Sequence, residues 1–281
     1  MKKSIVLDID GVIIGSRNGI NRPHPHPDVM AKLKNVRNRG IPIILCTAKP
    51  AFAIEYEIKE ADLNNPHIAD SGALLVDNKG KVYEQFLLEP ELAHDIVKAF
   101  LNKNVYVEVY TKDDYYIQSD QKGEWADQHA SIMQREPKVV DDLADFCMSH
   151  EITKIIQVVA TEAQKPEGDK NFAPFANRAN QVWAIHPAIL PLQFAIITAP
   201  NVTKVQGLID IAKIIDVNLC DMLAVGDSTS DWNFMSECGY VGAMGNASDE
   251  LKDLVTMRGG EIGPSVDENG VIDIIDWYLK I

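Results

Sequence analysis

Two aspartates follow an apolar run near the start of the chain. In "SIVLDIDGVII", the run Ile5–Leu7 leads into Asp8 and then Asp10. Residues i and i+2 of a strand point to the same side, so these carboxylates should lie close together. Like charges that close repel each other unless a proton or a cation intervenes. The pair therefore indicates either solvated acids at a strand end or a site for something positive.

A second acidic pair follows another apolar run. In "MLAVGDSTSDWNFM", the run Met222–Val225 is followed by Asp227 and, four residues later, Asp231. If both runs are parallel strands, the acids of both pairs meet outside the carboxyl ends of one sheet. A hard divalent cation bound through oxygen atoms resolves such a cluster, and Mg²⁺ is the predicted ion.

Two further residues could hold a phosphate group. Lys204 opens the helical pattern "KVQGLIDIAKIID" and could place a compact positive charge on a phosphate oxygen. Thr47 ends the apolar "IPIILCTA" and would offer a hydroxyl together with the amides of a helix start. Taken alone, Lys204 would be an ordinary surface lysine, and it gains significance only from its place in the series.

The elements that must position these groups alternate between strand and helix. The strand-like "SIVLDI" and "IPIILCTA" are followed by the helical patterns "HPDVMAKLKNVRNRG" and "PAFAIEYEIKEADL". This alternation predicts a parallel sheet with right-handed crossovers. The parallel pattern resumes at "KVQGLIDIAKIID", "DMLAVGD", "YVGAMGN" and "LVTM", before a closing helix from about Asp267.

The middle of the chain has a different character. "ALLVDNKGKVYEQFLL" predicts a hairpin with Asn78 and Gly80 at its turn, and a helix is expected near Pro90–Leu101. The alternating "VYVEVYT" and "YYIQS" predict antiparallel strands, and "EITKIIQVVA" and "QVWAIHPA" follow. We therefore predict an α/β protein with a Rossmann-like parallel-sheet core over residues 1–86 and 197–281. A smaller α+β module is inserted over residues 87–196.

Composition narrows the class of partners. The chain is 46% hydrophobic and 24% charged, as expected of a soluble globular protein, and no apolar run approaches the ~20 residues of a membrane span. The net charge of −14 disfavours nucleic acid and anionic membranes as partners. Four widely separated cysteines predict reduced core thiols in a cytoplasmic protein, namely Cys46, Cys147, Cys220 and Cys238.

The ordered set of motifs resembles the haloacid dehalogenase (HAD) superfamily of phosphatases. That signature is DxD at the first strand end, Thr or Ser at the second, a Lys, and then GDxxxD. The corresponding residues here are Asp8-Ile9-Asp10, Thr47, Lys204 and Gly226–Asp231. The place of the insertion is similar to the type IIB cap domain of the Cof-type subfamily, and "ADSGALLVDNKGKVY" and "GNASDELK" also resemble Cof-type segments.

The resemblance implies a role for each matching residue. Asp8 would attack phosphorus to give an aspartyl phosphate, and Asp10 would protonate the leaving oxygen and then activate water. Thr47 and Lys204 would hold the phosphoryl oxygens. The resemblance also implies that Mg²⁺ is bound by Asp8, by the main-chain carbonyl of Asp10 and by Asp227. Asp231 would bind the ion directly or through water.

Two positions depart from the family pattern. Where the family often has TGR, this chain has Thr47-Ala48-Lys49, so a planar guanidinium becomes a point charge. The substrate-binding set implied by the resemblance is then Thr47, Ala48, Lys49 and Lys204. Cof-type members often carry Asn before the last motif aspartate, and Ser230 stands there instead. Neither change removes a catalytic group.

The function expected from the resemblance is a Mg²⁺-dependent phosphatase of small phosphorylated metabolites, with sugar phosphates as the expected class. Two alternatives stay open: a phosphomutase or phosphotransferase of the same fold, and a non-catalytic metabolite-binding protein. We expect a monomer or a homodimer.

Other residues carry weaker signals. In "RPHPHPD", His24 and His26 could suggest a metal site, but the prolines favour a stiff loop before a helix capped near Asp28. The remaining histidines are isolated and receive no role: His67, His94, His129, His150 and His186. In the inserted module several side chains could touch a substrate, and we choose none of them: Tyr115, Tyr116, Trp125, Arg135 and Arg178. Aromatic residues in strands more often serve packing.

Overall fold

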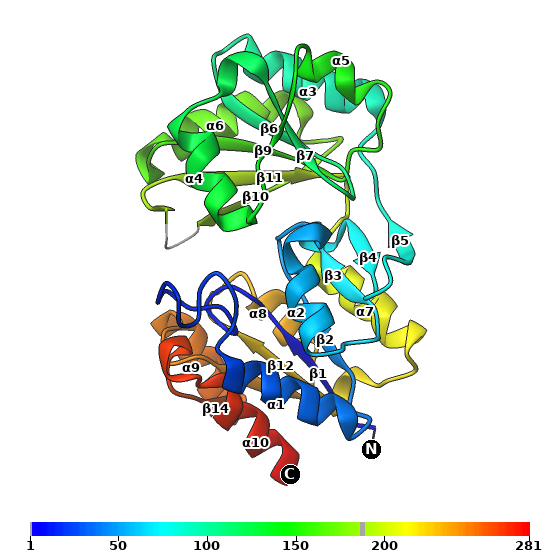
Figure 1. The fold of residues 1–281 in the computed structure, drawn as a ribbon, viewed down its shortest axis with the longest axis vertical. Coiled ribbons are helices and arrows are strands. Elements are labelled where there is room, and N and C mark those ends of the chain that lie inside the picture. Colours follow the sequence, from blue (N-terminus) through cyan, green and yellow to red (C-terminus); the bar gives the residue numbers. More distant parts are fainter. Residues whose placement is uncertain (1, 186–188) are drawn as a thin grey trace. The chain divides into compact units, whose positions relative to one another are not determined.

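The protein is described by a computed structural model that covers residues 2–185 and 189–281, so His186 lies outside the described residues. The chain forms two compact units (Figure 1). The first, called the core unit here, comprises Met1–Ala48, Ile54–Tyr83 and Thr203–Ile281. The second, called the insert unit, comprises Lys49–Ala53 and Glu84–Val202.

The core unit is built on a five-stranded parallel sheet, as the alternation of strand and helix predicts. The strand order is β14 (Glu261–Ile262), β13 (Tyr240–Ala243), β12 (Met222–Gly226), β1 (Ser4–Leu7) and β2 (Ile43–Leu45). Strand β1 lies between β12 and β2 and is buried along its whole length, which suits its apolar run Ile5–Leu7. The sheet therefore brings the first and fourth motifs onto neighbouring strands.

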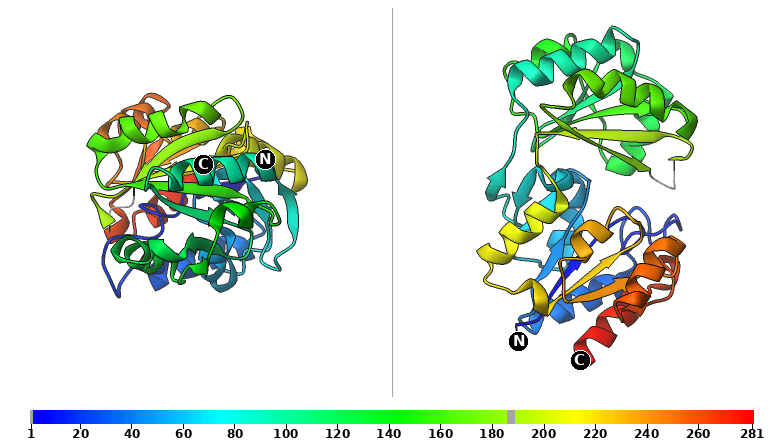
Figure 2. Two further views of the ribbon diagram at one scale, coloured as in Figure 1. Left: turned by 90° about the horizontal axis from the view of Figure 1, so that it is seen from above. Right: turned by 180° about the vertical axis from the view of Figure 1, so that it is seen from behind.

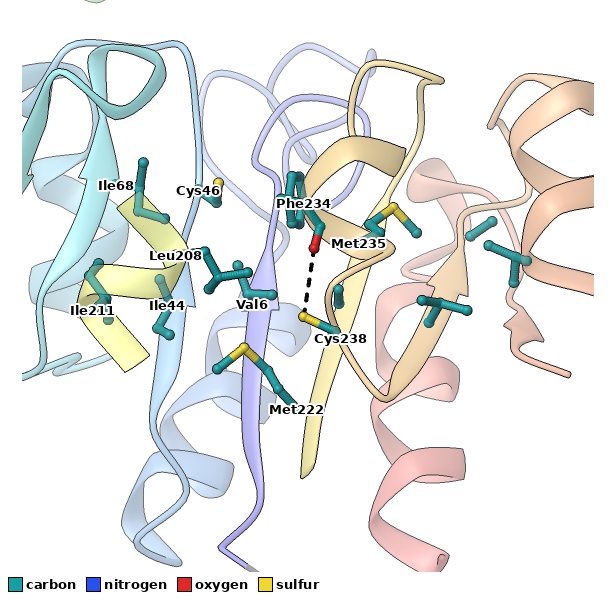
Figure 3. Close-up of a cluster of buried hydrophobic side chains, with 14 of the residues drawn as sticks. Val6, Ile44, Cys46, Ile68, Leu208, Ile211, Met222, Phe234, Met235 and Cys238 are labelled. Atoms are coloured by element: carbon teal, nitrogen blue, oxygen red, sulfur yellow. Dashed lines mark hydrogen bonds between the residues drawn. The ribbon is translucent and has the colours of Figure 1, made fainter. Parts of the chain in front are cut away.

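Six helices accompany this sheet: α1 (Pro27–Asn38), α2 (Glu55–Glu60), α7 (Lys204–Ile214), α8 (Trp232–Met235), α9 (Asp249–Met257) and α10 (Val271–Lys280). Side chains from α7, α8 and α9 form one buried cluster with the strands (Figure 3). In it Leu208 and Ile211 pack with Val6 and Ile44. Each such side chain contributes about 1.5–3 kcal/mol when fully buried. This packing holds helices α7, α8 and α9 against the sheet.

Two expectations for the C-terminal region need correction. "LVTM" lies in helix α9 and is not part of the parallel sheet, because Leu251 and Val255 form an apolar helical face. The closing helix begins at Val271 instead of near Asp267, because the preceding residues Val266–Glu268 form a short 3₁₀ turn capped by Ser265.

The predicted hairpin is present. Strands β4 (Leu74–Val76) and β5 (Val82–Gln85) are neighbours in a three-stranded sheet with β3 (His67–Ala69), a strand that the sequence pattern did not reveal. At the turn, the Asp77 carboxylate accepts hydrogen bonds from the amides of Lys79 and Lys81. Gly80 has a φ of 75°, a conformation that glycine adopts without steric cost.

The insert unit contains a mixed six-stranded sheet. Its order is β10 (Asn180–Ile185), β11 (Gln193–Thr198), β9 (Lys154–Val159), β6 (Tyr106–Tyr110), β7 (Tyr115–Gln118) and β8 (Lys138–Val140). Its strand pairs are antiparallel except for β7 with β8. The sheet is drawn from a second side in Figure 2. This matches the α+β character expected of the middle of the chain.

Helices cover both faces of this sheet. Three of them share a buried cluster with Val107 and Val109 on one face: α3 (Pro90–Leu101), α5 (Leu143–Cys147) and α6 (Lys165–Phe172). Helix α4 (Glu124–Met133) lies against the other face, because its His129 bonds to Glu108, which alternates with those valines along β6.

Three of the four cysteines are buried, as predicted, and Cys220 is exposed. The prediction of a core thiol is wrong for Cys220, which lies in a 3₁₀ turn before β12. Among the described residues no helix combines the length and the apolar character needed to cross a lipid bilayer.

A buried carboxylate organises the α4 side of the insert unit. Glu108 is fully buried and accepts hydrogen bonds from the Tyr106 and Tyr110 hydroxyls, while His129 Nδ1 lies 2.8 Å from its Oε2. Burial alone would raise the pKa of Glu108, but His129 and the two hydroxyls outweigh burial and lower it. The carboxylate therefore stays charged and ties β6 to α4.

We predict that Glu108→Ala destabilises the protein by about 3–5 kcal/mol at pH 7, because it breaks a buried hydrogen-bonded pair. Glu89→Ala is the control, since its exposed carboxylate pairs with Arg178 on the surface. Because the pKa of Glu108 is lowered in the folded protein, its charged carboxylate stabilises the fold at pH values above the ordinary pKa of 4.5. This stabilisation is lost as the pH falls through the lowered pKa. Urea unfolding should therefore show a smaller gap between wild type and Glu108→Ala below pH 4.5. A gap that is constant with pH would contradict the charged state of Glu108.

Candidate active site

Three carboxylates converge at one edge of the core sheet. Asp8 follows β1, Asp227 follows β12, and Asp231 directly precedes α8. The register pairs Leu7 with Val225, which places Asp8 beside the end of β12. One oxygen from each carboxylate lies within 4.8 Å of the other two. The structure therefore brings together three of the four acids selected from the sequence.

Lys204 supplies the positive charge of this cluster. Its Nζ donates to Asp8 Oδ1 at 2.8 Å and to Asp231 Oδ1 at 2.9 Å. The lysine is the first residue of α7, and the Thr203 hydroxyl caps that helix by accepting a hydrogen bond from the Gln206 amide. The helix start therefore fixes the lysine backbone, as its place in the sequence pattern suggested.

One lysine cannot compensate the charges of three acids equally, of which Asp8 and Asp231 are buried and Asp227 is partly buried. Burial raises the pKa of Asp8 to about 7 despite the nearby Lys204, and burial together with Asp8 and Asp231 raises the pKa of Asp227 to about 8. Burial would also raise the pKa of Asp231, but Lys204 and hydrogen bonds outweigh it and lower that pKa. Burial would lower the pKa of Lys204, but Asp231 and Asp8 raise it well above its ordinary value.

The donor set fits a hard divalent cation. Asp8 and Asp227 are carboxylates whose charged forms are disfavoured by burial and by their acidic neighbours. A bound cation would remove that penalty, and carboxylate oxygens are the ligands that Mg²⁺ prefers. In the ranges that the structure describes, Asp8, Asp227 and Asp231 are the one group of three or more acidic, histidine or cysteine ligands close enough for an ion.

Asp231 also holds the loop that contains Asp227 and Ser228. Its Oδ2 accepts hydrogen bonds from the backbone amides of Asp227 and Ser228 and from the Ser228 hydroxyl. With Oδ1 bound to Lys204, both carboxylate oxygens are engaged by the protein. Ser230, at the position of the family's asparagine, lies with its hydroxyl 2.8 Å from that of Ser228.

Asp10 lies in the tight turn after β1, and its charge acts on both Asp8 and Asp227. Gly11 follows with a φ of 81°, and a Cβ atom there would lie 1.9 Å from Asp227 Oδ2. A side chain at this position would therefore strain the backbone and force the Asp227 carboxylate to move.

Thr47 is buried two residues after β2 and is held through its backbone. Its amide donates to the Ile68 carbonyl at 3.0 Å, and its carbonyl accepts from the Ser71 amide at 3.1 Å. The expected helix-start amides do not follow directly, because the next helical residues are Ala51–Ile54. Pro50 disfavours helical geometry at Lys49, which explains the delay. Ala48 ends a segment of the core unit, whereas Lys49 belongs to the insert unit.

Sequence reasoning missed the turn that joins Thr47 to Lys204. Asp70, Ser71 and Gly72 have φ values of 50°, 60° and 107°, which is a strained run for the first two residues. A Cβ atom on Gly72 would lie 2.4 Å from the carbonyl oxygen of Thr203, the cap of α7. The strings "DSG" and "DNKG" both contain turn residues, and only the three-dimensional contact distinguishes them.

We predict that Gly72→Ala lowers both stability and any activity that depends on Lys204, because its Cβ atom would displace Thr203 and the start of α7. Gly80→Ala is a matched control: its φ is also positive, but a Cβ atom there meets nothing within 4 Å. Both variants carry a backbone cost of about 1–2 kcal/mol. Thermal unfolding should show a larger loss for Gly72→Ala, and equal losses would contradict the proposed contact.

The histidine loop forms other contacts. His26 caps α1, with its Nδ1 accepting from the Asp28 amide at 3.2 Å, so the prediction of a cap near Asp28 was displaced by two residues. His24 stacks on Tyr56 and places Nδ1 3.2 Å from Glu57 Oε1. Both rings therefore serve the local structure around α1 and α2.

The candidate side chains of the insert unit show packing contacts. The Tyr115 ring stacks on Tyr110, and its hydroxyl donates to the Arg135 carbonyl. The other contacts are likewise structural: Tyr116 with Phe146, Trp125 edge-on to Tyr106, and Arg178 with Glu89.

The fold is that of a haloacid dehalogenase-like hydrolase. Residues 5–275 match the sequence profile of the haloacid dehalogenase-like hydrolases, and the chain belongs to that family. Among characterised relatives it is 26% identical to the 5-amino-6-(5-phospho-D-ribitylamino)uracil phosphatase YwtE of Bacillus subtilis, over 99% of this chain and 98% of that protein. It is 22% identical to the phosphatase YwpJ of the same organism, over 93% of this chain and 96% of that protein.

Solved structures agree on the fold. A haloacid dehalogenase-like hydrolase from Bacteroides thetaiotaomicron superposes with a TM-score of 0.83 at 17% identity, covering 98% of this chain and 99% of the other. A subclass IIB sugar phosphatase superposes with a TM-score of 0.78 at 18% identity, covering 99% and 100%. The predicted family, the α/β fold class and the class of enzyme are therefore confirmed.

Proposed function

We propose that this protein is a Mg²⁺-dependent phosphatase that hydrolyses small phosphorylated metabolites, with sugar phosphates as the main class, through an aspartyl phosphate. The observation that carries the proposal is the position of Lys204, which bonds to Asp8 and Asp231 while Asp227 completes the acidic cluster. Two solvated acids at a strand end would not need a partly buried lysine and a third carboxylate beside them.

Asp8 is the proposed nucleophile. One of its oxygens attacks phosphorus, the bond to the leaving oxygen breaks, and water later hydrolyses the acyl phosphate to return the carboxylate. Lys204 Nζ, 2.8 Å from Asp8 Oδ1, holds the attacking carboxylate and would also contact a phosphoryl oxygen. Asp10 is the proposed acid that protonates the leaving oxygen and the base that activates water.

Thr47 would hold a phosphoryl oxygen through its hydroxyl, with its backbone anchored by Ile68 and Ser71. Ala48 and Lys49 complete the proposed substrate-binding set, by resemblance to the family. Phosphoryl transfer depends almost entirely on positioning and charge stabilisation, so these contacts would form a large part of catalysis.

The residues that would hold Mg²⁺ are Asp8, Asp227 and the main-chain carbonyl of Asp10. Asp231 would act through a water molecule or through Lys204, because both of its oxygens already accept hydrogen bonds from the protein. The ion, when bound, would neutralise charge on the phosphoryl group and on the attacking carboxylate.

We further propose that residues 1–86 and 197–281 act as the catalytic core and residues 87–196 as a cap. A cap of this kind closes to exclude bulk water during the reaction and opens for product release. We expect a cytoplasmic monomer or homodimer, for which the three buried cysteines and the charge of −14 are suitable properties.

The first test is phosphate release with Mg²⁺ and with chelator. We expect metal-dependent release that Asp8→Asn lowers by at least about 10³-fold, since the nucleophile is lost. Asp216→Asn is the control, because its side chain is fully exposed. The panel should contain sugar phosphates, nucleotides, phosphoglycolate and the phosphoribityl compound of the B. subtilis relative. Release that is insensitive to chelator and to Asp8→Asn would refute the mechanism.

The same assay separates the alternatives. In a phosphomutase or phosphotransferase a sugar hydroxyl takes the phosphoryl group from Asp8, so a transfer product would accumulate instead of free phosphate. A non-catalytic metabolite-binding protein would bind a phosphorylated compound without turnover. The relatives named as phosphatases favour hydrolysis over both.

A second variant tests the lysine. Lys204→Met should lower kcat/KM by about 100-fold or more, because Asp8 and the phosphoryl group both lose their cationic partner. Lys213→Met is matched to it, since Lys213 lies in the same helix with an exposed ammonium group bonded to Asp210. Steady-state kinetics of both variants provide the measurement, and equal effects would contradict the role of Lys204.

A further inference from the structure

The loop after β13 contacts the backbone of the fourth motif. The Met244 amide donates to the Gly226 carbonyl at 3.3 Å, and the Ser248 amide donates to the Asp227 carbonyl at 3.1 Å. This loop, residues 244–248, contributes no side chain to the acidic cluster described above. It nevertheless supports the strand end from which Asp227 emerges.

Asn246 links the same loop to the first motif. Its Nδ2 donates to the Gly11 carbonyl at 2.9 Å, and its Oδ1 accepts from the Val266 amide at 2.7 Å. Its two amide atoms therefore bridge segments that lie 235 and 20 residues away in the sequence. Gly245 brings the backbone close enough, since a Cβ atom there would lie 2.7 Å from the Ser265 amide nitrogen.

Gly11 is the residue through which this bridge acts on the site. Its amide donates to the Ile14 carbonyl at 2.8 Å, while its carbonyl accepts from Asn246, so hydrogen bonds fix the peptide on each side of it. Because Gly11 lies against Asp227 Oδ2 and directly follows Asp10, rotation at this residue would move both acidic loops relative to each other.

We propose that Asn246 is a positioning residue that holds Gly11, and thereby sets the spacing of Asp10 from Asp227, for cation binding. This inference rests on the proposed function. Within the described residues Asn246 forms no hydrogen bond with the three clustered carboxylates or with Lys204, and it acts through the Gly11 peptide.

A positioning role of Asn246 can be distinguished from a merely structural one by comparing thermal stability with metal affinity. The residue is exposed, its bond to Gly11 is exposed and its bond from Val266 is partly buried, so solvent can replace much of what these bonds contribute to folding. Asn246→Ala should therefore lower the unfolding midpoint by only about 2–4 °C. Loss of a residue that orients metal ligands typically lowers metal affinity by about 10–100-fold. The two effects differ enough to be distinguished.

The experiment compares wild type, Asn246→Ala and Asn218→Ala. Asn218 is also exposed and also bonds to a backbone amide, that of Cys220, away from the acidic cluster. Calorimetric titration of the metal-free proteins with Mg²⁺ should show affinity at least about 10-fold weaker for Asn246→Ala and unchanged for Asn218→Ala. Phosphate release should require correspondingly more Mg²⁺ in Asn246→Ala.

The outcomes are separable. If wild type binds Mg²⁺ and releases phosphate while Asn246→Ala matches its affinity within twofold, the positioning role is wrong and the proposed function stands. An equal loss in Asn218→Ala would also overturn the positioning role. If wild type neither binds Mg²⁺ nor releases phosphate, the proposed function fails, and the role of Asn246 fails with it.

Discussion

Concentrating three carboxylates around one ammonium group is the constraint on which the rest of the core unit depends. Asp8, Asp227 and Asp231 would repel one another, and Lys204 balances only part of their charge. The arrangement persists because neighbouring buried strands and a capped helix fix the backbone of each group. The stability of the apolar sheet and its helices therefore offsets the electrostatic cost of the site.

The sequence was sufficient for the groups that lie at the ends of strongly patterned elements. Asp8 and Asp227 follow short apolar runs in a chain that alternates between strand and helix patterns, and parallel sheets collect the ends of such strands at one edge. Lys204 was predictable only from its place in the ordered series of motifs, at the start of a helical pattern. Local pattern and topology together specified these positions.

Residues whose importance depends on a distant contact could not be found this way. Asn246 is one of many polar loop residues until Gly11, 235 positions earlier, lies beside it. The turn at Asp70–Gly72 resembles any hairpin turn until Thr203 packs on it. Short segments were ambiguous for another reason: "LVTM" has an apolar residue pattern that suits a strand or a helix, and packing against the sheet decided for the helix.

The chain crosses from one unit to the other immediately beside two residues of the site. Thr47 lies two residues before Lys49, the first residue of the insert unit, and Thr203 and Lys204 directly follow its last residue, Val202. The main segment of the insert unit, Glu84–Val202, therefore begins after Ile68 and Ser71, which anchor Thr47, and ends before Thr203, which caps α7. A change in the length or composition of that segment can therefore leave the backbone positions of Thr47 and Lys204 as they are.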